Sequence, residues 1–202
     1  MRIVIIVGSH RRGSESTRVG SFLEATLAGL DPGVTIDTID LAGNPLPLWD
    51  ESAWQPDSEL AALWKPIRDR LRKADGLVVV TPEWGGTVPP GLKNLLLLAG
   101  SREVGHKPGL IVAVSSGRGG SYPVAELRVS GTKNNRLAWI PEQVIVHDVA
   151  GMLRGDEPAD ERDAWLRRRI GFALRILLAY AAALGPVRAS GVTEHPDFPY
   201  GM

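Results

Sequence analysis

Cysteine is missing from this chain of 202 residues. Without cysteine the protein has no disulfide bond, no thiol nucleophile and no iron–sulfur cluster held by thiolates. A chain without thiols fits a reducing compartment. We therefore expect a cytoplasmic protein whose chemistry comes from other groups.

A surplus of charge is missing as well. The 23 basic residues are balanced by 23 acidic residues, which leaves a formal net charge of +0 at pH 7. Proteins that bind nucleic acids or anionic membrane surfaces usually carry a basic surplus. We expect neither partner, and any site for an anion must be local.

Neither a signal peptide nor a long hydrophobic run is evident. Met1 leads directly into a short apolar run, with no basic segment before it and no cleavage site after it. The longest apolar stretch, residues 170–184, contains Arg175 and is too short to span a bilayer. We expect this stretch to form a core helix.

What the sequence does contain is an alternation of short apolar runs with helical patterns. Runs without polar alternation, typical of strands buried on both faces of a parallel sheet, occur at residues 3–7, 77–80 and 108–115. Further strands are predicted at residues 34–41 and 143–149. Helices are predicted at residues 17–30, 58–73, 122–137 and 160–184, with another opening near residue 91. Pro66 predicts that the second helix begins late or bends.

This alternation predicts an α/β fold with a doubly wound, five-stranded parallel sheet and helices on both faces. The flavodoxin-like strand order 2-1-3-4-5 would bring the loops after strands one, three and four around one crevice. The length and spacing of the elements predict a single domain over residues 1–184. A tail rich in Pro and aromatic residues follows at 185–202.

The loop after the first strand, residues 8–16, is rich in hydroxyl groups and leads into a helix. Free backbone N–H groups and the positive end of a helix suit a phosphate. Additional donors in this loop are Ser9, Arg11, Ser14 and Ser16. The alternative is that Ser14 or Ser16 only caps the helix.

Two better-known phosphate loops are excluded by residues within this segment. The lysine of a nucleoside-triphosphate loop is missing, because Ser14 and Glu15 follow Gly13. The second glycine of a dinucleotide fingerprint is missing, because His10 stands at its position. A monoester phosphate is the better match, and we expect His10 to face solvent.

The loop after the third strand, residues 81–94, combines prolines that restrict the backbone with glycines that allow close approach. This composition suits a platform for a planar molecule. The alternative is an ordinary turn between strand and helix. The loop after the fourth strand, residues 116–121, is a second glycine-rich segment whose amides would be free to donate to a carbonyl or an anionic ring edge. Its alternative is a plain tight turn.

Together these loops resemble the NADPH-dependent FMN reductase family. Residues 8–14, GSHRRGS, are similar to its phosphate loop G-S-x-R-x-x-S, and residues 81–94, TPEWGGTVPPGLKN, resemble its T-P-E-Y-N-x-S-x-P-x-x-L-K-N. The segments 107–108, Lys-Pro, and 117–120, GRGG, also fit the pattern, so that the match spans about residues 1 to 147. Two departures are Trp84 in place of Tyr and Gly85 in place of Asn.

The resemblance implies that the crevice binds FMN. The FMN phosphate would be held by Ser9, Arg11, Ser14 and Ser16. The isoalloxazine would be bordered by Pro82, Glu83, Trp84, Gly85, Gly86 and Thr87, and approached from the fourth-strand loop by Ser116, Gly117 and Gly119. The cofactor carries the chemistry in such proteins, so we expect no catalytic side chain and no metal site.

The resemblance also implies an FMN-dependent oxidoreductase that takes hydride from NADPH or NADH and reduces a small-molecule acceptor such as a quinone, an azo compound or a flavin. Two alternatives remain open, a flavodoxin-type electron carrier and an FMN-binding protein without turnover. Four consecutive leucines at residues 95–98 cannot all face inward on one helix. We therefore expect a homodimer or homotetramer.

Overall fold

The computed structural model describes residues 1–198, so residues 199–202 of the predicted tail lie outside the described part. One parallel sheet has the order β2-β1-β3-β4-β5, which confirms the predicted flavodoxin-like arrangement. Its strands are β1 (Arg2–Val7), β2 (Thr35–Asp40), β3 (Gly76–Pro82), β4 (Pro108–Val114) and β5 (Ala138–Val146).

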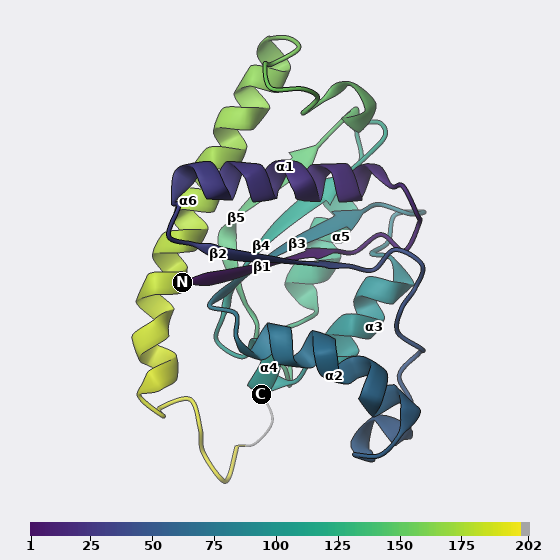
Figure 1. Ribbon diagram of the computed structural model, residues 1–202, viewed down its shortest axis with the longest axis vertical. Helices are drawn as coiled ribbons and strands as arrows, with labels where there is room; N and C mark the ends of the chain where they lie inside the picture. The colour runs from purple at the N-terminus through teal and green to yellow at the C-terminus, as the bar shows by residue number, and fades with distance from the viewer. Residues whose placement is uncertain (199–202) are drawn as a thin grey trace.

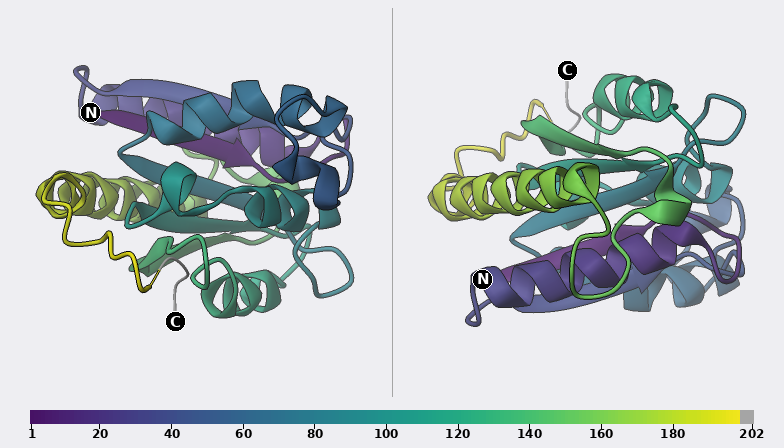
Figure 2. Two further views of the ribbon diagram at one scale, coloured as in Figure 1. Left: turned by 90° about the horizontal axis from the view of Figure 1, so that it is seen from below. Right: turned by 90° about the horizontal axis from the view of Figure 1, so that it is seen from above.

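Helices cover both faces of the sheet, as predicted (Figure 1). One face carries α1 (Glu15–Leu30) and α6 (Glu161–Ala189), which lie side by side when the molecule is seen from above (Figure 2). The other face carries α2 (Glu59–Arg72), α3 (Pro90–Leu98), α4 (Ser101–Val104) and α5 (Ser121–Val129). Two short 3-10 helices are η1 (Glu51–Trp54) and η2 (Val149–Gly151).

The apolar runs of the central strands serve two separate cores. In β1, Ile3, Ile5 and Val7 pack with α1 and α6, whereas Val4 and Ile6 pack with the helices of the opposite face. Successive side chains of a strand point to opposite faces, so a strand covered on both sides needs apolar residues at every position. This arrangement explains the missing polar alternation.

Two predicted boundaries between residues 122 and 149 are wrong. Helix α5 ends at Val129 instead of residue 137, because Gly131 (φ 81°) and Asn134 (φ 64°) turn the chain into left-handed conformations. Strand β5 then begins at Ala138 instead of residue 143. It contains Pro141, which is tolerated because β5 is an edge strand of the sheet.

Two predictions about proline meet different outcomes. Helix α2 begins at Glu59 and continues through Pro66, so it does not begin late, and a bend at Pro66 stays a prediction. Helix α6 continues through Gly185 and Pro186 to Ala189, so the first residues of the predicted tail are helical.

Helix α6 has 29 residues and is longer than the apolar stretch that predicted it. Within residues 1–198 it is the one helix whose length and hydropathy would suffice for a membrane span. Length and composition alone are weak evidence for a membrane span, because long core helices meet the same criteria. Here α6 buries Ile170, Leu174 and Leu177 against the sheet, as expected of a core helix.

The long connection between β2 and α2 is fastened to α3. The side-chain amide of Asn94 donates to the carbonyl of Pro47 at 2.7 Å, and its oxygen accepts the N–H of Trp49 at 2.7 Å. Leu46 is buried in the core of this face, while Leu48 is exposed. The connection therefore packs as a surface flap over α3.

Close packing where β1 ends predicts the effect of one substitution. The N–H of Gly8 donates to the carbonyl of Val80 at 2.8 Å, and a Cβ at Gly8 would lie 2.9 Å from that oxygen and 2.6 Å from Cδ2 of Leu92. Gly8→Ala should lower the free energy of unfolding by about 1–3 kcal/mol, measured by urea denaturation.

The control for this substitution is Gly29→Ala on the exposed surface of α1. No atom lies within 4 Å of a Cβ placed there. Alanine should raise the free energy of unfolding by roughly 0.5–1 kcal/mol because it restricts the unfolded chain and suits a helix. Equal stability of the two variants would contradict the packing described at Gly8.

Candidate functional site

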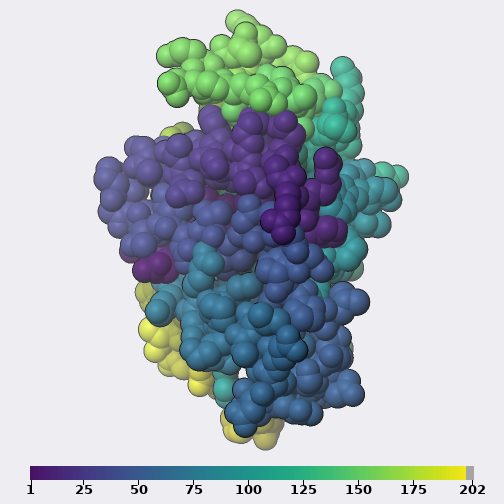
Figure 3. All heavy atoms as spheres, turned by 45° about the vertical axis from the view of Figure 1, so that its right-hand side comes forward, coloured from purple at the N-terminus to yellow at the C-terminus, as the bar shows by residue number. Residues whose placement is uncertain are grey.

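The loops after β1, β3 and β4 meet at the carboxyl edge of the sheet, on the right-hand side of Figure 1. With that side turned forward in Figure 3, the deep purple first loop lies beside teal segments of the chain. The loops enclose a crevice of ≈ 310 Å³. Eight predicted site residues line it: Ser9, Arg11, Ser14, Ser16, Pro82, Glu83, Trp84 and Ser116.

The other predicted residues lie in the turns next to the crevice and do not line it: Gly85, Gly86, Thr87, Gly117 and Gly119. Conversely, the sequence did not predict a role for Glu15, Val114 or Val149, which do line it. Val149 begins η2, beyond β5, and an apolar residue beside a strand carries no local signal of a binding site. The fold brings it to the crevice, where its N–H donates to the carbonyl of Ser115 at 3.1 Å.

The first loop is arranged around the start of α1. The hydroxyl of Ser14 accepts the N–H of Thr17 at 3.1 Å, so Ser14 caps the helix. The hydroxyl of Thr17 donates to Asp40 at 3.2 Å, which leaves the hydroxyl of Ser14 to donate to Thr17 Oγ1 at 3.0 Å. In this arrangement Ser14 is fully engaged as the cap.

The remaining donors of the first loop stay close to the crevice. Ser9 and Ser16 are buried, with exposed fractions of 1% and 2%, although their hydroxyls border a polar space. The first N–H groups of α1 have no acceptor within the helix and point out of its N-terminus. Arg11 is exposed and lines the crevice, and within residues 1–198 it forms no ion pair.

The side chain of Glu15 lines this end of the crevice. Its carboxylate is bound by Arg18 at 2.6 Å and by Arg154 at 2.9 Å. These two guanidinium groups offset its charge. The crevice therefore keeps the character of an anion site despite the carboxylate.

The loop after β3 closes through a tight turn. Trp84 and Thr87 exchange backbone hydrogen bonds of 3.2 and 3.1 Å, and Gly85 (φ 58°) and Gly86 (φ 78°) form the left-handed corner between them. Glycine and asparagine are the residues that adopt such a corner most readily. Gly85 in place of Asn therefore preserves the backbone of the loop and removes only a side-chain amide.

Glu83 connects the two glycine-rich loops. Its carboxylate accepts the N–H of Gly120, and its own N–H donates to the carbonyl of Val114 at 3.2 Å. A Cβ at Gly119 would lie 2.9 Å from the carboxylate, so a larger residue there would displace the Glu83 side chain. Glu83 thus acts as a clamp between the loops after β3 and β4.

The amides of the loop after β4 are less free than the sequence suggested. The N–H groups of Gly117 and Gly119 both donate to the hydroxyl of Ser115, at 3.2 and 3.1 Å. Together with Gly120, whose N–H is bound by Glu83, three amides of the expected nest already have acceptors. This loop borders the crevice mainly through its shape and through Ser116.

The prediction that His10 faces solvent is wrong. Its ring packs edge-on against Trp84, with the ring centroids 4.5 Å apart. Its Nδ1 is buried and has no hydrogen-bond partner within residues 1–198. His10 supports the indole of Trp84 from the side of the first loop.

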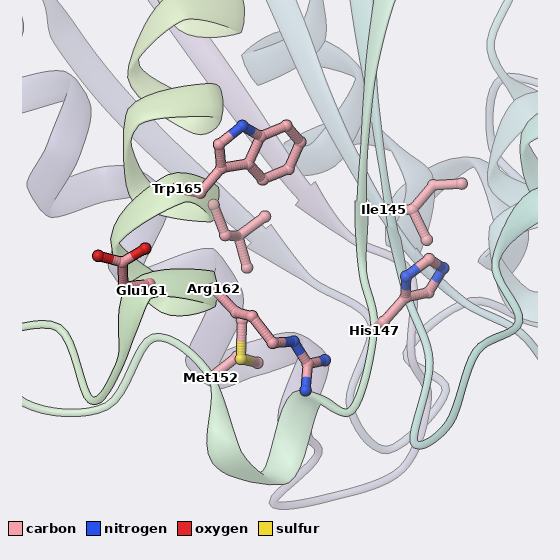
Figure 4. Close-up of a pocket in the computed structure, with 7 residues that line it drawn as sticks. Ile145, His147, Met152, Glu161, Arg162 and Trp165 are labelled. Carbon is pink, nitrogen blue, oxygen red and sulfur yellow. The ribbon is translucent and has the colours of Figure 1, made fainter.

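A second cavity of ≈ 350 Å³ lies between the end of β5 and the first turns of α6 (Figure 4). Ile145 and His147 face Arg162 and Trp165 of α6 across it. Arg162 forms an ion pair of 2.8 Å with Asp148, so the charges on this wall largely cancel. The N–H of Asp148 donates to the carbonyl of Gly117 at 2.8 Å, which ties this wall to the loop after β4.

Known proteins match both the sequence and the fold. The family model described as NADPH-dependent FMN reductase matches residues 1–151. The 2-hydroxy-1,4-benzoquinone reductase of a Burkholderia species is 33% identical over 155 residues, which cover 73% of this chain and 80% of that protein. The FMN-dependent NADPH-azoreductase of Staphylococcus haemolyticus is 32% identical over 149 residues, covering 73% of this chain and 78% of that protein.

Solved structures show the same fold at low sequence identity. The flavoenzyme NAD(P)H:(acceptor) oxidoreductase of Paracoccus denitrificans has a TM-score of 0.69 at 20% identity, covering 89% of this chain and 98% of that chain. The FMN-dependent NADH-azoreductase of Bacillus anthracis, in complex with FMN, has a TM-score of 0.58 at 17% identity, covering 88% and 100%. These likenesses concern the fold alone.

The clamp between the two glycine-rich loops predicts a loss of stability. Glu83→Ala leaves the N–H of Gly120 without its acceptor and should lower the free energy of unfolding by about 1–3 kcal/mol in urea denaturation. Glu83→Gln keeps a carbonyl oxygen in place and should lose less. Wild-type stability of Glu83→Ala would show that the carboxylate does not hold the loops together.

Proposed function

The chain belongs to the NADPH-dependent FMN reductase family, and on this basis we propose that it binds FMN in the crevice and transfers electrons from NADPH to quinone or azo compounds. One observation carries the proposal. Within a chain that matches the family over residues 1–151, a hydroxyl-rich helix start, an indole and a clamped glycine-rich loop line the same crevice.

The residues of the crevice fit FMN chemically. Ser9 and Ser16 line this end with hydroxyl groups, and the exposed guanidinium of Arg11 forms no ion pair within residues 1–198, so this end suits a phosphate. Trp84 and Pro82 line the other end with flat, largely apolar surface, which suits an aromatic ring system. The crevice volume of ≈ 310 Å³ lies within the usual range for cofactor sites.

We assign roles to the predicted site residues on this basis. Ser9, Arg11, Ser16 and the first N–H groups of α1 bind the phosphate, while Ser14 fixes the start of the helix. Pro82, Glu83, Trp84 and Ser116 border the ring, and the turns next to them are formed by Gly85, Gly86, Thr87, Gly117 and Gly119.

When bound, FMN supplies the chemistry that accepts hydride from NADPH and passes it to the acceptor. The protein contributes position and environment. Glu83 holds the two ring-bordering loops at a fixed separation, and His10 supports Trp84. Val114 and Val149 provide apolar walls that exclude water from the crevice. We assign no acid–base residue, because the carboxylate of Glu83 is engaged with Gly120.

We also propose a cytoplasmic homodimer. The outer surface of α3 and its neighbours exposes large apolar side chains, among them Leu48 (72% exposed), Leu97 (64%) and Val129 (85%). Leu48 and Leu97 border a mostly apolar hollow of ≈ 430 Å³. Apolar surface of this kind is typical of an interface between subunits. The hollow lies beside α3, which follows the loop that carries Trp84.

The proposed cofactor and electron donor predict a spectroscopic result. The purified protein should be yellow or take up added FMN, and NADPH should bleach the bound flavin under anaerobic conditions. Flavin that binds but stays oxidised with excess NADPH and NADH would favour an electron carrier or a protein without turnover. A protein that binds no FMN would refute the proposal entirely.

The phosphate site predicts a difference between two neighbouring arginines. Arg11→Ala removes a charge-assisted hydrogen bond of about 1.5–3 kcal/mol and should raise the Kd for FMN by roughly ten- to a hundredfold in a fluorescence titration. Arg12→Ala is the matched control, because the guanidinium of Arg12 lies against Gly43 and does not line the crevice. Equal effects of both substitutions would rule out a specific role for Arg11.

The proposed interface predicts the behaviour of Leu97. The wild-type protein should be a dimer by light scattering, and Leu97→Asp should produce monomers because it places a charge in the apolar hollow. Tyr180→Asp on the exposed face of α6, across the sheet, should remain dimeric. A monomeric wild-type protein would refute the interface.

A further inference from the structure

A polar cavity of ≈ 320 Å³ lies at the opposite end of the sheet, where β3 and β4 begin, and residues of α2, α4 and α6 contribute to its lining. Strand β4 has 7 residues, so this cavity is roughly 20 Å from the crevice at the carboxyl edge. Six basic side chains line it: Arg72, Lys73, Arg102, Lys107, Arg136 and Arg188.

These cations outnumber the acidic groups around them. Asp75 and Glu194 line the cavity, and Glu103 binds Arg72 from the side at 2.9 Å. The cavity therefore carries a surplus of three positive charges, in a chain whose formal net charge is +0. Such a local surplus attracts anions from solution.

The protein itself neutralises only some of this charge. Arg188 reaches Asp75 at 3.3 Å, and Arg136 donates to the carbonyl of Thr193 at 2.8 Å. Lys73 and Arg102 are exposed and form no ion pair within residues 1–198. Two cations at the mouth of the cavity are therefore free to bind a ligand.

Lys107 places a buried charge in the wall of the cavity. Its side chain is 5% exposed, and its ammonium donates to the carbonyls of Leu71 at 2.6 Å and Arg72 at 2.9 Å, at the end of α2. An ammonium has three N–H donors, and the third has no acceptor within residues 1–198. Burial and the nearby Arg188 lower the pKa of Lys107 to about 8.

His106 is a second incompletely satisfied group in the same wall. Its Nε2 is buried and has no hydrogen-bond partner within residues 1–198, and its backbone is left-handed at φ 54°. Burial, Arg136 and Arg188 lower its pKa, because a further positive charge is unfavourable there. An anion in the cavity would give the third N–H of the Lys107 ammonium an acceptor.

We propose that this cavity binds a multiply charged phosphate anion, either as a free diphosphate or as the diphosphate of a nucleotide. Arginine guanidinium groups and lysine ammonium groups are the side chains that bind phosphate oxygens most readily. The volume of ≈ 320 Å³ is sufficient for a small ligand. The site is separate from the crevice proposed for FMN, so the protein would bind phosphate groups at both ends of its sheet.

The test is isothermal titration of FMN-saturated protein with sodium pyrophosphate and, separately, with ADP, at constant ionic strength. FMN fills the phosphate site of the crevice, so that a saturable signal reports a second site. Saturation by both ligands would indicate that the diphosphate is sufficient, and saturation by ADP alone would indicate that the base contributes. No saturable binding of either ligand would overturn the proposal.

Substitutions of cavity residues test whether the anion binds in this cavity. The double variant Lys73→Gln/Arg102→Gln should raise the Kd by at least about tenfold, because it removes the two free cations. Arg168→Gln/Arg175→Gln is the matched control, since it removes two exposed charges of α6 outside the cavity and should leave the Kd unchanged. Glu194→Gln removes a carboxylate from the cavity wall and should lower the Kd. Equal Kd values for wild type and Lys73→Gln/Arg102→Gln would refute the site.

Discussion

Burial of the central strands on both faces is the constraint that shapes this molecule. Every side chain of β1 from Ile3 to Val7, and all of β3 and β4, is inaccessible to solvent or nearly so. In a strand covered on both sides, only residues at the ends can reach a ligand, as Pro82 and Val114 do at the crevice. Binding is therefore confined to the two edges of the sheet, where loops leave and enter the strands. The crevice and the basic cavity occupy these two edges.

The loops at the carboxyl edge can form a binding surface of fixed shape because hydrogen bonds hold them to one another. Glu83 reaches from the end of β3 to Gly120 before α5, and Ser115 gathers the amides of Gly117 and Gly119. Glycine is required at Gly120, whose N–H the Glu83 carboxylate accepts, because its φ is 113° and a Cβ there would overlap Cγ2 of Ile145. The glycines of these loops thus serve contacts between loops as well as tight turns. A planar ligand would meet a preformed surface whose shape does not depend on its presence.

The strand order and the three crevice loops could be predicted, because continuous apolar runs and glycine-rich loops are local signals. The structure of residues 130–141 could not be predicted in this way. The helical sequence pattern continues past Gly131, where the helix has already ended, and Pro141 lies within a strand that tolerates it only because the strand is at the edge of the sheet. Ser115 and Val149 were missed for another reason. Their roles depend on partners from other loops, and no local pattern marks them. The clamp by Glu83 likewise exists only once β3 and β4 are adjacent.

Helix α6 lies outside the segment that matches the family model, yet it covers the same face of the sheet as α1. Leu110, Val112 and Val146 have their apolar cover only when residues 161–189 are in place. A ribosome makes these residues after every strand of the sheet. During synthesis this apolar face of the sheet therefore stays uncovered for some seconds, at ordinary elongation rates of about 5–20 residues per second. Chaperones that recognise exposed apolar segments would have their longest opportunity to bind during this interval.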